Sequence, residues 1–226
     1  QKAMKIASQR DMAEVVAKFN IKPDKGIDHA VALGYVEKTP ENVAAFLKAT
    51  TGLLAEQIGE YIGEAKEWHI SVMHAFIDGI SFTDVHFFDE ALRKLVERSG
   101  FKLPGEAQKI DRIMLKFAER YHIECPDIFS CADTAYILAY SIIMLNTDAD
   151  NPAVKKKMTK EEFLRNNRGI DDGRDLPAEL LEGIYERITS RPFRLHDMPG
   201  AAPSDAAAST PRDTPSAETE RRDSDI

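Results

Sequence analysis

An acidic residue, Glu106, stands at the start of a long stretch with helical periodicity, directly after the pair Pro104-Gly105. Proline favours the first turn of a helix, where its missing N–H would have no partner, and glycine permits a tight entry. The free amides and the dipole of a helix start favour an ionised carboxylate. The sequence therefore predicts a charged carboxylate on the first helical turn, at the tip of a loop. That charge is either a helix cap or a group that acts on another molecule.

The helix that would carry Glu106 has one apolar face. Its large apolar residues recur at intervals of three and four, and they are Ile110, Ile113, Met114, Phe117, Ala118 and Tyr121. This spacing places them on one side of a helix and predicts that they face the core. We therefore expect the Glu106 turn to be firmly anchored.

A second helix, predicted over residues 133–148, has a different pattern, because apolar residues occur nearly all round it. A helix of this kind is expected to be central and mostly buried. Pro152 prevents its continuation beyond Asn151. Near its end, Met144 and Leu145 fit either core positions or an exposed apolar patch for a partner.

Other combinations of reactive residues fit known sites poorly. His122, Glu124, Cys125 and Cys131 resemble part of a zinc deaminase signature, but the order of Cys and Pro is reversed and the spacing is wrong. The three potential zinc ligands, His122, Cys125 and Cys131, do not complete a tetrahedral site. We expect a loop with free thiols and no metal.

The acidic run that begins at Asp148 resembles a calcium loop only superficially. The sixth and twelfth positions, which need glycine and glutamate, hold Ala153 and Thr159. A basic cluster follows, made of Lys155, Lys156, Lys157, Arg165 and Arg168. It is either a solvated face or a weak contact with anionic lipid or an acidic partner.

Bulk properties narrow the class of protein. The 226 residues are 43% hydrophobic, which is enough for one substantial core, and no apolar run is long enough for a membrane span. The net charge of −8 disfavours nucleic-acid binding through phosphate contacts. Two cysteines without framework spacing are typical of a reducing, cytoplasmic compartment. The N-terminus shows no signal-peptide pattern, and Gln1 suggests a segment of a longer protein.

Helical patterns dominate the remaining chain, and strand-like alternation is essentially absent, so an all-α fold is predicted. A first helix over 3–19 should end at Lys22-Pro23 and a turn at Gly26. Thr39 and Thr159 are typical helix caps, the second within a capping box. Further helices are expected over 53–62, 68–76, 87–96 and 180–188. We expect one domain over 1–196 and a disordered, acidic, Pro/Ala/Ser-rich tail over 197–226.

Several segments together resemble a known family. They are Phe19–Ile27, Leu103–Arg112, Ala139–Asp148 closing at Asn151-Pro152, Asn166–Ile170 and Asp175–Pro177. In this order and spacing they resemble the Sec-seven domain, the catalytic module of guanine-nucleotide exchange factors for ADP-ribosylation factor (Arf) GTPases. The resemblance covers about residues 1–195 and is strongest to the large Golgi-type subfamily.

The resemblance implies an elongated, all-α domain of about ten helices in a right-handed superhelix. It implies that Glu106 is a "glutamic finger", which enters the nucleotide site of the GTPase near the β-phosphate and Mg²⁺. The implied partner groove includes Asp111, Tyr140, Ile143, Met144 and Asn151. The implied partner is an Arf GTPase in its GDP-bound and nucleotide-free forms.

The implied activity needs no cofactor and breaks no covalent bond, so the domain would be an exchange catalyst rather than an enzyme in the covalent sense. The rival hypothesis is a non-catalytic helical scaffold that binds a small GTPase or an adaptor. By the same resemblance, Tyr140, Ser141, Asp148 and Met158 imply sensitivity to brefeldin A. Peripheral recruitment from the cytoplasm to Golgi membranes is also implied.

Two positions depart from the family pattern. Asp150 stands where a histidine is usual, and Leu115 where an acidic residue is frequent.

Overall fold

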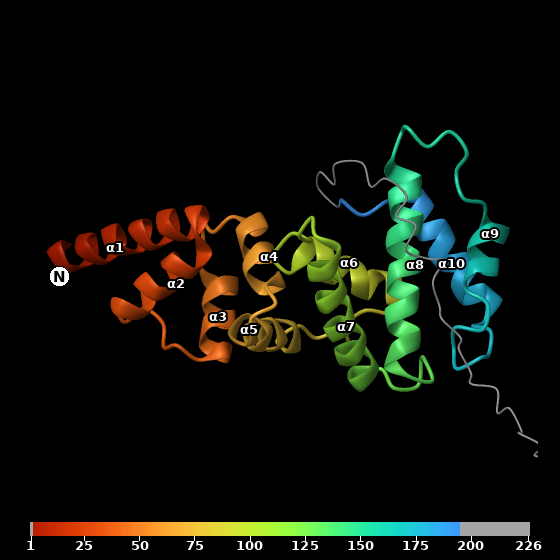
Figure 1. Cartoon of the computed structure of the whole chain (residues 1–226), viewed down its shortest axis with the longest axis horizontal. Helices are drawn as coiled ribbons and strands as arrows, with labels where there is room; N and C mark the ends of the chain where they lie inside the picture. The colour runs from red at the N-terminus through yellow and green to blue at the C-terminus, as the bar shows by residue number, and fades with distance from the viewer. Residues whose placement is uncertain (1, 195–226) are drawn as a thin grey trace, which may run out of the picture. The chain divides into compact units, whose positions relative to one another are not determined.

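The computed structural model describes residues 2–194, with side chains from residue 9 onward. Within this range the fold consists of ten helices and no strand, which confirms the predicted all-α class (Figure 1). The helices are α1 Lys2–Ile21, α2 Pro23–Ala32, α3 Pro40–Ala49, α4 Ala55–Gly63, α5 Glu67–Asp78, α6 Phe88–Arg98, α7 Ala107–Glu124, α8 Ala132–Asp150, α9 Lys160–Asn166 and α10 Ala178–Ser190. The predicted boundary at 196/197 and the predicted acidic tail lie outside the described residues.

The predicted helices over 53–62, 68–76, 87–96 and 180–188 are confirmed as α4, α5, α6 and α10, with ends that differ by one or two residues. The predicted caps are confirmed as well. The Thr39 hydroxyl accepts a hydrogen bond from the Asn42 amide at 3.3 Å, and Thr159 forms a capping box with Glu162. Local capping chemistry thus sets the starts of α3 and α9.

The expected turn at Gly26 is wrong, because α2 begins at Pro23 and continues through Gly26. Proline is well placed at the first position of a helix, so it ends α1 and starts α2. Gly26 is needed for packing. A Cβ atom there would lie 2.4 Å from Cα of Phe19, so only glycine lets α2 pack this closely on α1.

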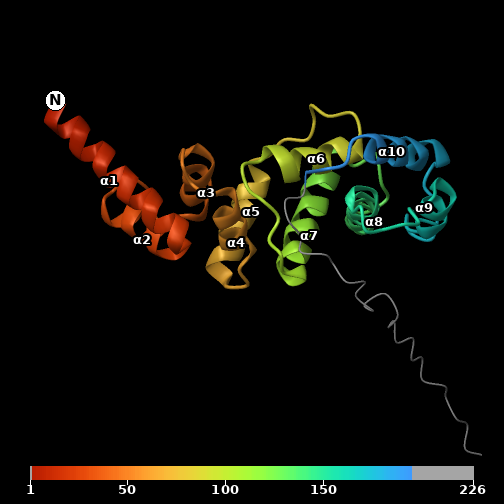
Figure 2. The same cartoon turned by 90° about the horizontal axis from the view of Figure 1, so that it is seen from above.

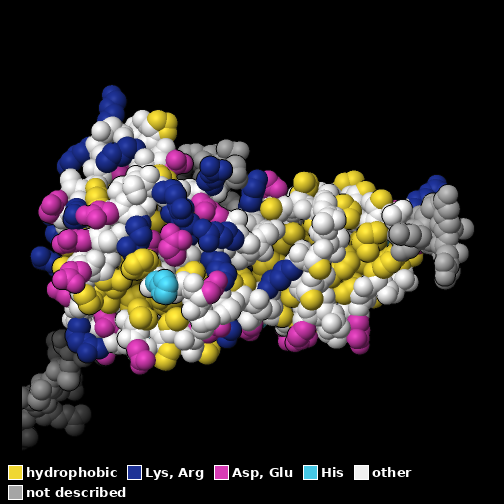
Figure 3. Space-filling model, turned by 180° about the vertical axis from the view of Figure 1, so that it is seen from behind, with side chains coloured by type: hydrophobic (Ala, Val, Ile, Leu, Met, Phe, Trp, Pro, Cys, Tyr) yellow, Lys and Arg dark blue, Asp and Glu magenta, His cyan; other side chains and the backbone are white. Residues whose placement is uncertain are grey.

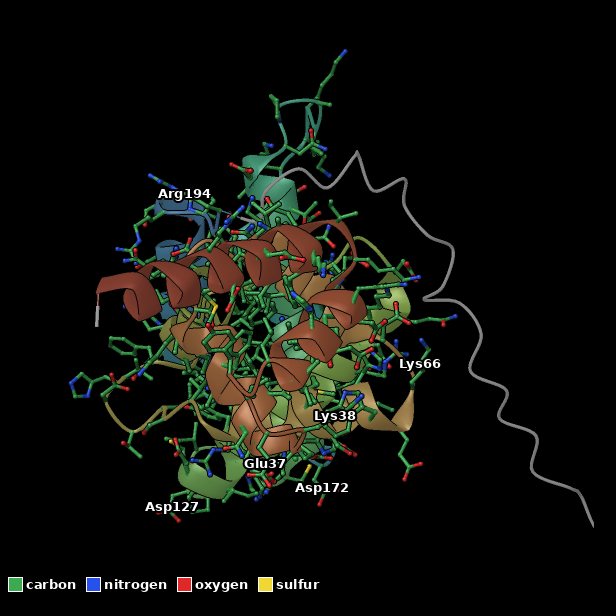
Figure 4. The ribbon with its side chains drawn as sticks, turned by 90° about the vertical axis from the view of Figure 1, so that its left-hand side faces the viewer. Glu37, Lys38, Lys66, Asp127, Asp172 and Arg194 are labelled. Atoms are coloured by element: carbon green, nitrogen blue, oxygen red, sulfur yellow. The ribbon has the colours of Figure 1, made fainter. Side chains whose placement is uncertain are left out.

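The connection from α2 to α3 is held by polar contacts at the edge of the fold. Glu37 and Lys38, both labelled in Figure 4, lie in this connection. Lys38 pairs with Asp28 at 2.8 Å, and the Glu37 carboxylate accepts a hydrogen bond from the Asn42 side chain at 3.3 Å. These contacts join α2 and α3 across the turn, although exposed pairs of this kind contribute little to stability.

The core around α7 is aromatic. The predicted stripe from Ile110 to Tyr121 is buried, as expected. Phe117 and Tyr121 pack against a ring before α6 and a ring at its first residue, with Phe82 edge-on to Phe117 at 5.2 Å and Phe88 edge-on to Tyr121 at 4.9 Å. Edge-to-face packing adds to the hydrophobic stabilisation of these side chains. The helix that begins after Glu106 is therefore firmly fixed.

Helix α8 lies beside α7, and α9 and α10 pack on its other side (Figures 1 and 2). A carboxylate outside the helix holds its first turn. Asp171 accepts hydrogen bonds from the Ser130 amide and hydroxyl, both at 2.8 Å, and from the Thr134 hydroxyl at 3.0 Å. The hydrogen bond from the Ser130 amide is the main cause of the lowered pKa of Asp171.

Helices α6 and α10 are joined by a partly buried ion pair. The Arg187 guanidinium donates to both oxygens of the fully buried Asp89, at 2.9 and 2.7 Å, and this bond raises the pKa of Arg187. Further ion pairs involve α6, with Lys94 on Asp84 and Arg191 on Glu90. Figure 3 shows a face of the molecule on which Lys and Arg side chains lie among Asp and Glu side chains. The pair of Arg187 and Asp89 fixes α10 against α6 across a large separation in sequence.

The last described residues close the domain against α6 and α8. The Phe193 amide donates to the side chain of Asn146, and the Arg93 guanidinium lies 4.6 Å from the Phe193 ring. Arg93 also donates to the carbonyl of Arg191 at 2.6 Å. Among the described residues, no helix has both the length and the apolar content that crossing a bilayer requires.

Candidate functional site on α7 and α8

Glu106 is the residue immediately before α7, and its backbone is extended rather than helical. The expectation that Pro104 and Glu106 occupy the first helical turn is therefore wrong. Pro104 lies in the loop before α7 and is buried, so it does not open the helix. The Glu106 carbonyl accepts the Ile110 amide at 3.1 Å, but its carboxylate caps no amide and its side chain is 69% exposed. A capping role does not account for this carboxylate.

The loop that carries Glu106 is built directly on α4. The Lys102 amide donates to the Ala55 carbonyl at 3.0 Å. A Cβ atom on Gly59 would lie only 1.9 Å from the Lys102 carbonyl oxygen, so this contact requires glycine. One turn later, a Cβ atom on Gly63 would lie 2.9 Å from Cβ of Lys109. Two glycines on one face of α4 thus allow the loop and the start of α7 to pack closely against it.

The first turn of α7 contains a nearly buried lysine. Lys109 is 9% exposed, and its ammonium lies 2.6 Å from Glu60, 2.8 Å from Glu64 and 3.3 Å from Glu106. Burial lowers the pKa of Lys109, but the hydrogen bonds to Glu60 and Glu64 outweigh burial and raise it overall. The same ammonium lowers the pKa of Glu64. Lys109 therefore remains charged beneath the tip of the loop.

Asp111 and Tyr140, two predicted groove residues, meet between α7 and α8. The Asp111 carboxylate accepts hydrogen bonds from the hydroxyls of Tyr136 at 2.5 Å and Tyr140 at 3.2 Å. The two tyrosine rings pack at 5.2 Å. Burial, followed by the bond to Asp111, raises the pKa of Tyr136 to about 12, and burial and the Asp111 charge also raise the pKa of Tyr140. Sequence analysis missed Tyr136, which its position one turn before Tyr140 could have indicated.

Helix α8 is not buried all round, so that expectation is wrong in part. Ile142 and Leu145 are in the core, whereas Ile137 and Met144 are exposed, Met144 by 58%. Ile137, Tyr140 and Met144 follow one another at helical spacing, with Ile143 half-buried beside them. The alternative left open for Met144 and Leu145 is thus resolved, with Met144 on the surface and Leu145 in the core. An apolar surface stripe of this kind is typical of a partner-binding site.

Comparison with known proteins identifies the family. The profile of the Sec7 (Sec-seven) domain matches residues 8–193. The chain belongs to the Sec7 domain family.

Relatives and solved structures agree with this assignment. The chain is 51% identical over 191 residues to brefeldin A-inhibited guanine nucleotide-exchange protein 2 of Arabidopsis thaliana, which covers 84% of this chain and 10% of that protein. It is 46% identical, with a TM-score of 0.75, to a crystal structure of the Sec7p catalytic domain, over 80% of this chain and 94% of the other. A structure of ARF1-GDP bound to a Sec7 domain with brefeldin A is 34% identical, with a TM-score of 0.78, over 85% and 97%. The chain spans about a tenth of the length of the curated relatives that it matches.

At the end of α8, side chains of predicted site residues accept hydrogen bonds from backbone amides of the following segment. The Asn151 side chain accepts a hydrogen bond from the Ala153 amide at 2.9 Å, and the Asp148 carboxylate accepts one from the Met158 amide at 2.8 Å. Lys157 donates to the carbonyls of Asp148 and Asn151 at 2.5 and 2.6 Å. Lys157 therefore caps α8, and the basic cluster is not simply a solvated face.

The Sec7 domain brings the predicted residues together unevenly. Asp111 and Tyr140 are in contact, and Asp148 contacts Met158, whereas the Glu106 carboxylate pairs with Lys109 on α7. The three carboxylates around the Lys109 ammonium were not anticipated, since the bond from Lys109 to Glu60 joins α7 to α4 across about fifty residues of sequence. Among the described residues, no group of three or more His, Cys, Asp or Glu side chains has a metal-binding arrangement, and Cys125 and Cys131 are free thiols.

Proposed function

We propose that this Sec7 domain catalyses the release of GDP from an Arf-family GTPase and so promotes loading with GTP in vesicle trafficking. The observation that carries the proposal is the position of the Glu106 carboxylate. It is exposed and caps no backbone amide of α7, at the tip of a loop that is anchored on α4. A rigid, exposed charge is suited to act on another molecule. The solved complex of a Sec7 domain with ARF1-GDP supports the choice of partner.

In the proposed mechanism, Glu106 enters the nucleotide site and weakens the binding of GDP electrostatically. A carboxylate about 4 Å from a phosphate is repelled by roughly 1 kcal/mol in water and by about 4 kcal/mol at an effective dielectric of 20. Each ~1.4 kcal/mol corresponds to a tenfold change in an equilibrium. Displacing Mg²⁺ would remove a large positive charge and strengthen the effect. No covalent bond changes, and the chemistry requires no cofactor.

The energy for this insertion would come from the apolar stripe on α8. Met144 and Ile143 offer apolar surface, and Tyr140 is held in place by Asp111. Well-packed apolar contacts at the centre of an interface contribute most of the binding energy. Asn151 completes the proposed groove at the end of α8, where its side chain already stabilises the turn.

The experiment that tests the proposal measures the release of fluorescent GDP from an N-terminally truncated Arf, with the wild-type domain and with Glu106→Lys. We expect the variant to lose exchange while still forming a GDP-bound complex. A matched control is Glu119→Lys, which makes the same charge change at an exposed position within α7. Equal, accelerated rates for wild type and Glu106→Lys would refute the role of Glu106, whereas rates no faster than that of Arf alone for both would favour the rival scaffold function.

We also propose that brefeldin A inhibits exchange by this domain. The Arabidopsis relative is named for this inhibition. Of the implied positions, Asp148 and Met158 line one surface hollow, and the Ser141 hydroxyl accepts a hydrogen bond from Asn167 at 2.8 Å. Exchange that stays unaffected at drug concentrations that inhibit a known sensitive member would refute this proposal.

The proposed site of action is the Golgi membrane, with the domain recruited peripherally from the cytoplasm. The relatives are named as guanine nucleotide-exchange factors, and the Golgi location follows from the resemblance to the large Golgi-type subfamily. In the basic cluster, Lys156 is highly exposed and could make a weak contact with anionic lipid. Flotation with anionic and neutral vesicles tests this contact, and equal binding to both would exclude it.

A further inference from the structure

The ammonium of Lys109 sits between the tip of the loop and helix α4. Its three carboxylate neighbours are Glu60 at 2.6 Å, Glu64 at 2.8 Å and Glu106 at 3.3 Å. One ammonium and three carboxylates leave this cluster with a negative charge. Glu60, in the last turn of α4, and Glu64, which directly follows α4, are the closer partners, and Glu106 is the most distant.

An ammonium this close to Glu106 poses an electrostatic problem for the proposed mechanism. A carboxylate paired with a single ammonium forms a dipole, whose effect on a distant phosphate is much weaker than that of a full negative charge. An unneutralised ammonium would also attract the phosphates that exchange must release. A lysine at this position therefore opposes exchange unless other groups neutralise it.

Glu60 and Glu64 supply that neutralisation. Glu60 is in the last turn of α4 and Glu64 directly follows the helix, each about 40% exposed in its side chain, and both contact the same ammonium. The absence of a side chain at Gly63 allows the stem of Lys109 to lie against α4, within reach of both. Arg112 donates to the Gly63 carbonyl in the next turn of α7, which fixes the two helices in this register.

The geometry also restrains Glu106. An exposed glutamate has considerable rotamer freedom, which it would lose on entering a partner. The contact with Lys109 already limits that freedom, and it is the longest of the three and so the most readily broken. Lys109 thus holds the carboxylate at the tip without binding it tightly.

We propose that Lys109 is a positioning residue for Glu106, and that Glu60 and Glu64 neutralise its ammonium so that the tip keeps its negative charge. This inference rests on the proposed exchange function. It assigns to α4 an electrostatic part in exchange, in addition to its part in anchoring the loop.

The test is the double variant Glu60→Gln, Glu64→Gln, which leaves Lys109 with Glu106 as its only carboxylate partner in this cluster. We expect kcat for GDP release to fall by about tenfold, the order of a single charge near a phosphate, with KM for Arf unchanged. The matched control is Glu56→Gln, on the same helix, which pairs with Lys102 instead. The control should keep its kcat within twofold.

A third substitution separates an electrostatic role from a structural one. Adding Lys109→Met to the double variant removes the unneutralised ammonium, so kcat should recover at least threefold despite the lost positioning. A purely structural role predicts a further loss instead. Circular dichroism and thermal unfolding verify that each variant is folded.

The outcomes distinguish this inference from the proposed function. If Glu106→Lys abolishes exchange but the double variant has wild-type kcat, the inference is overturned and the proposed function stands. A triple variant that is slower than the double variant also overturns it. If Glu106→Lys releases GDP as fast as wild type, the proposed role of Glu106 fails and the inference with it, and if neither protein accelerates release, the proposed function itself fails.

Discussion

The packing of the Glu106 loop on Gly59 leads to a sharp prediction for Gly59→Ala. The added Cβ atom would lie 1.9 Å from the Lys102 carbonyl oxygen, whereas real Cβ atoms essentially never come closer than 3.0 Å. The oxygen lies in the backbone, so it cannot rotate away as a flexible side chain could. The loop segment before Glu106 would therefore have to move by about 1 Å.

Two opposing energies decide the effect on stability. Alanine is favoured over glycine within a helix by about 1 kcal/mol. Overpacking costs about 1–3 kcal/mol, and weakening the bond between the Lys102 amide and the Ala55 carbonyl costs about 1 kcal/mol more. We expect Gly59→Ala to lower the free energy of unfolding by roughly 1–3 kcal/mol, as measured by urea denaturation.

The effect on exchange should be larger than the effect on stability suggests. A displacement of about 1 Å in a reacting group can reduce a rate by about a hundredfold. Since Glu106 lies four residues beyond Lys102, we expect kcat/KM for GDP release to fall by at least about tenfold in the folded variant. The control is Gly105→Ala, in the same loop, where an added Cβ atom meets nothing within 4 Å and stability should be unchanged.

Two results would refute this reasoning. A Gly59→Ala variant that is more stable than wild type would show that helix propensity outweighs the close contact. A variant with wild-type kcat/KM would show that the anchorage of the loop on α4 does not position Glu106.

Three further predictions concern stability and partner binding. Arg187→Ala should lower the free energy of unfolding by about 3–5 kcal/mol, because it leaves the buried Asp89 carboxylate unpaired, and a loss below about 1 kcal/mol in urea denaturation would contradict this. Leu145→Ala should cost about 2–5 kcal/mol, whereas Met144→Ala should leave stability within about 1 kcal/mol but raise KM for Arf, and the reverse pattern would be inconsistent with their burial. Asp171→Asn tests a hydrogen-bonded carboxylate, because the hydrogen bond from the Ser130 amide holds the pKa of Asp171 below its ordinary value in the folded state. Its stabilisation is therefore complete above the unfolded pKa of about 3.9 and is lost as pH falls through the folded pKa. Asp171→Asn should thus be less stable than wild type at pH 7 and converge with it in acid, and an equal difference at both pH values would argue against this.

Much of the fold follows from local sequence patterns. Threonine caps at Thr39 and Thr159 start their helices as predicted, and the stripe from Ile110 to Tyr121 is buried as predicted. Capping and helical periodicity act over a few residues, so they can be read along the chain. Gly26 was misinterpreted because its role depends on the distance to Phe19 in another helix, which no local pattern records.

By itself, the sequence determined that the protein is helical, which residues form the face of α7, and which motifs carry the family resemblance. Only the tertiary structure decided that the Glu106 carboxylate caps nothing, that Met144 is exposed while Leu145 is buried, and that Lys109 is surrounded by acids from α4. The physical reason is that capping and periodicity are short-range properties. Exposure and electrostatic environment depend instead on which helices pack together, and here α4 and α7 meet across about fifty residues of chain.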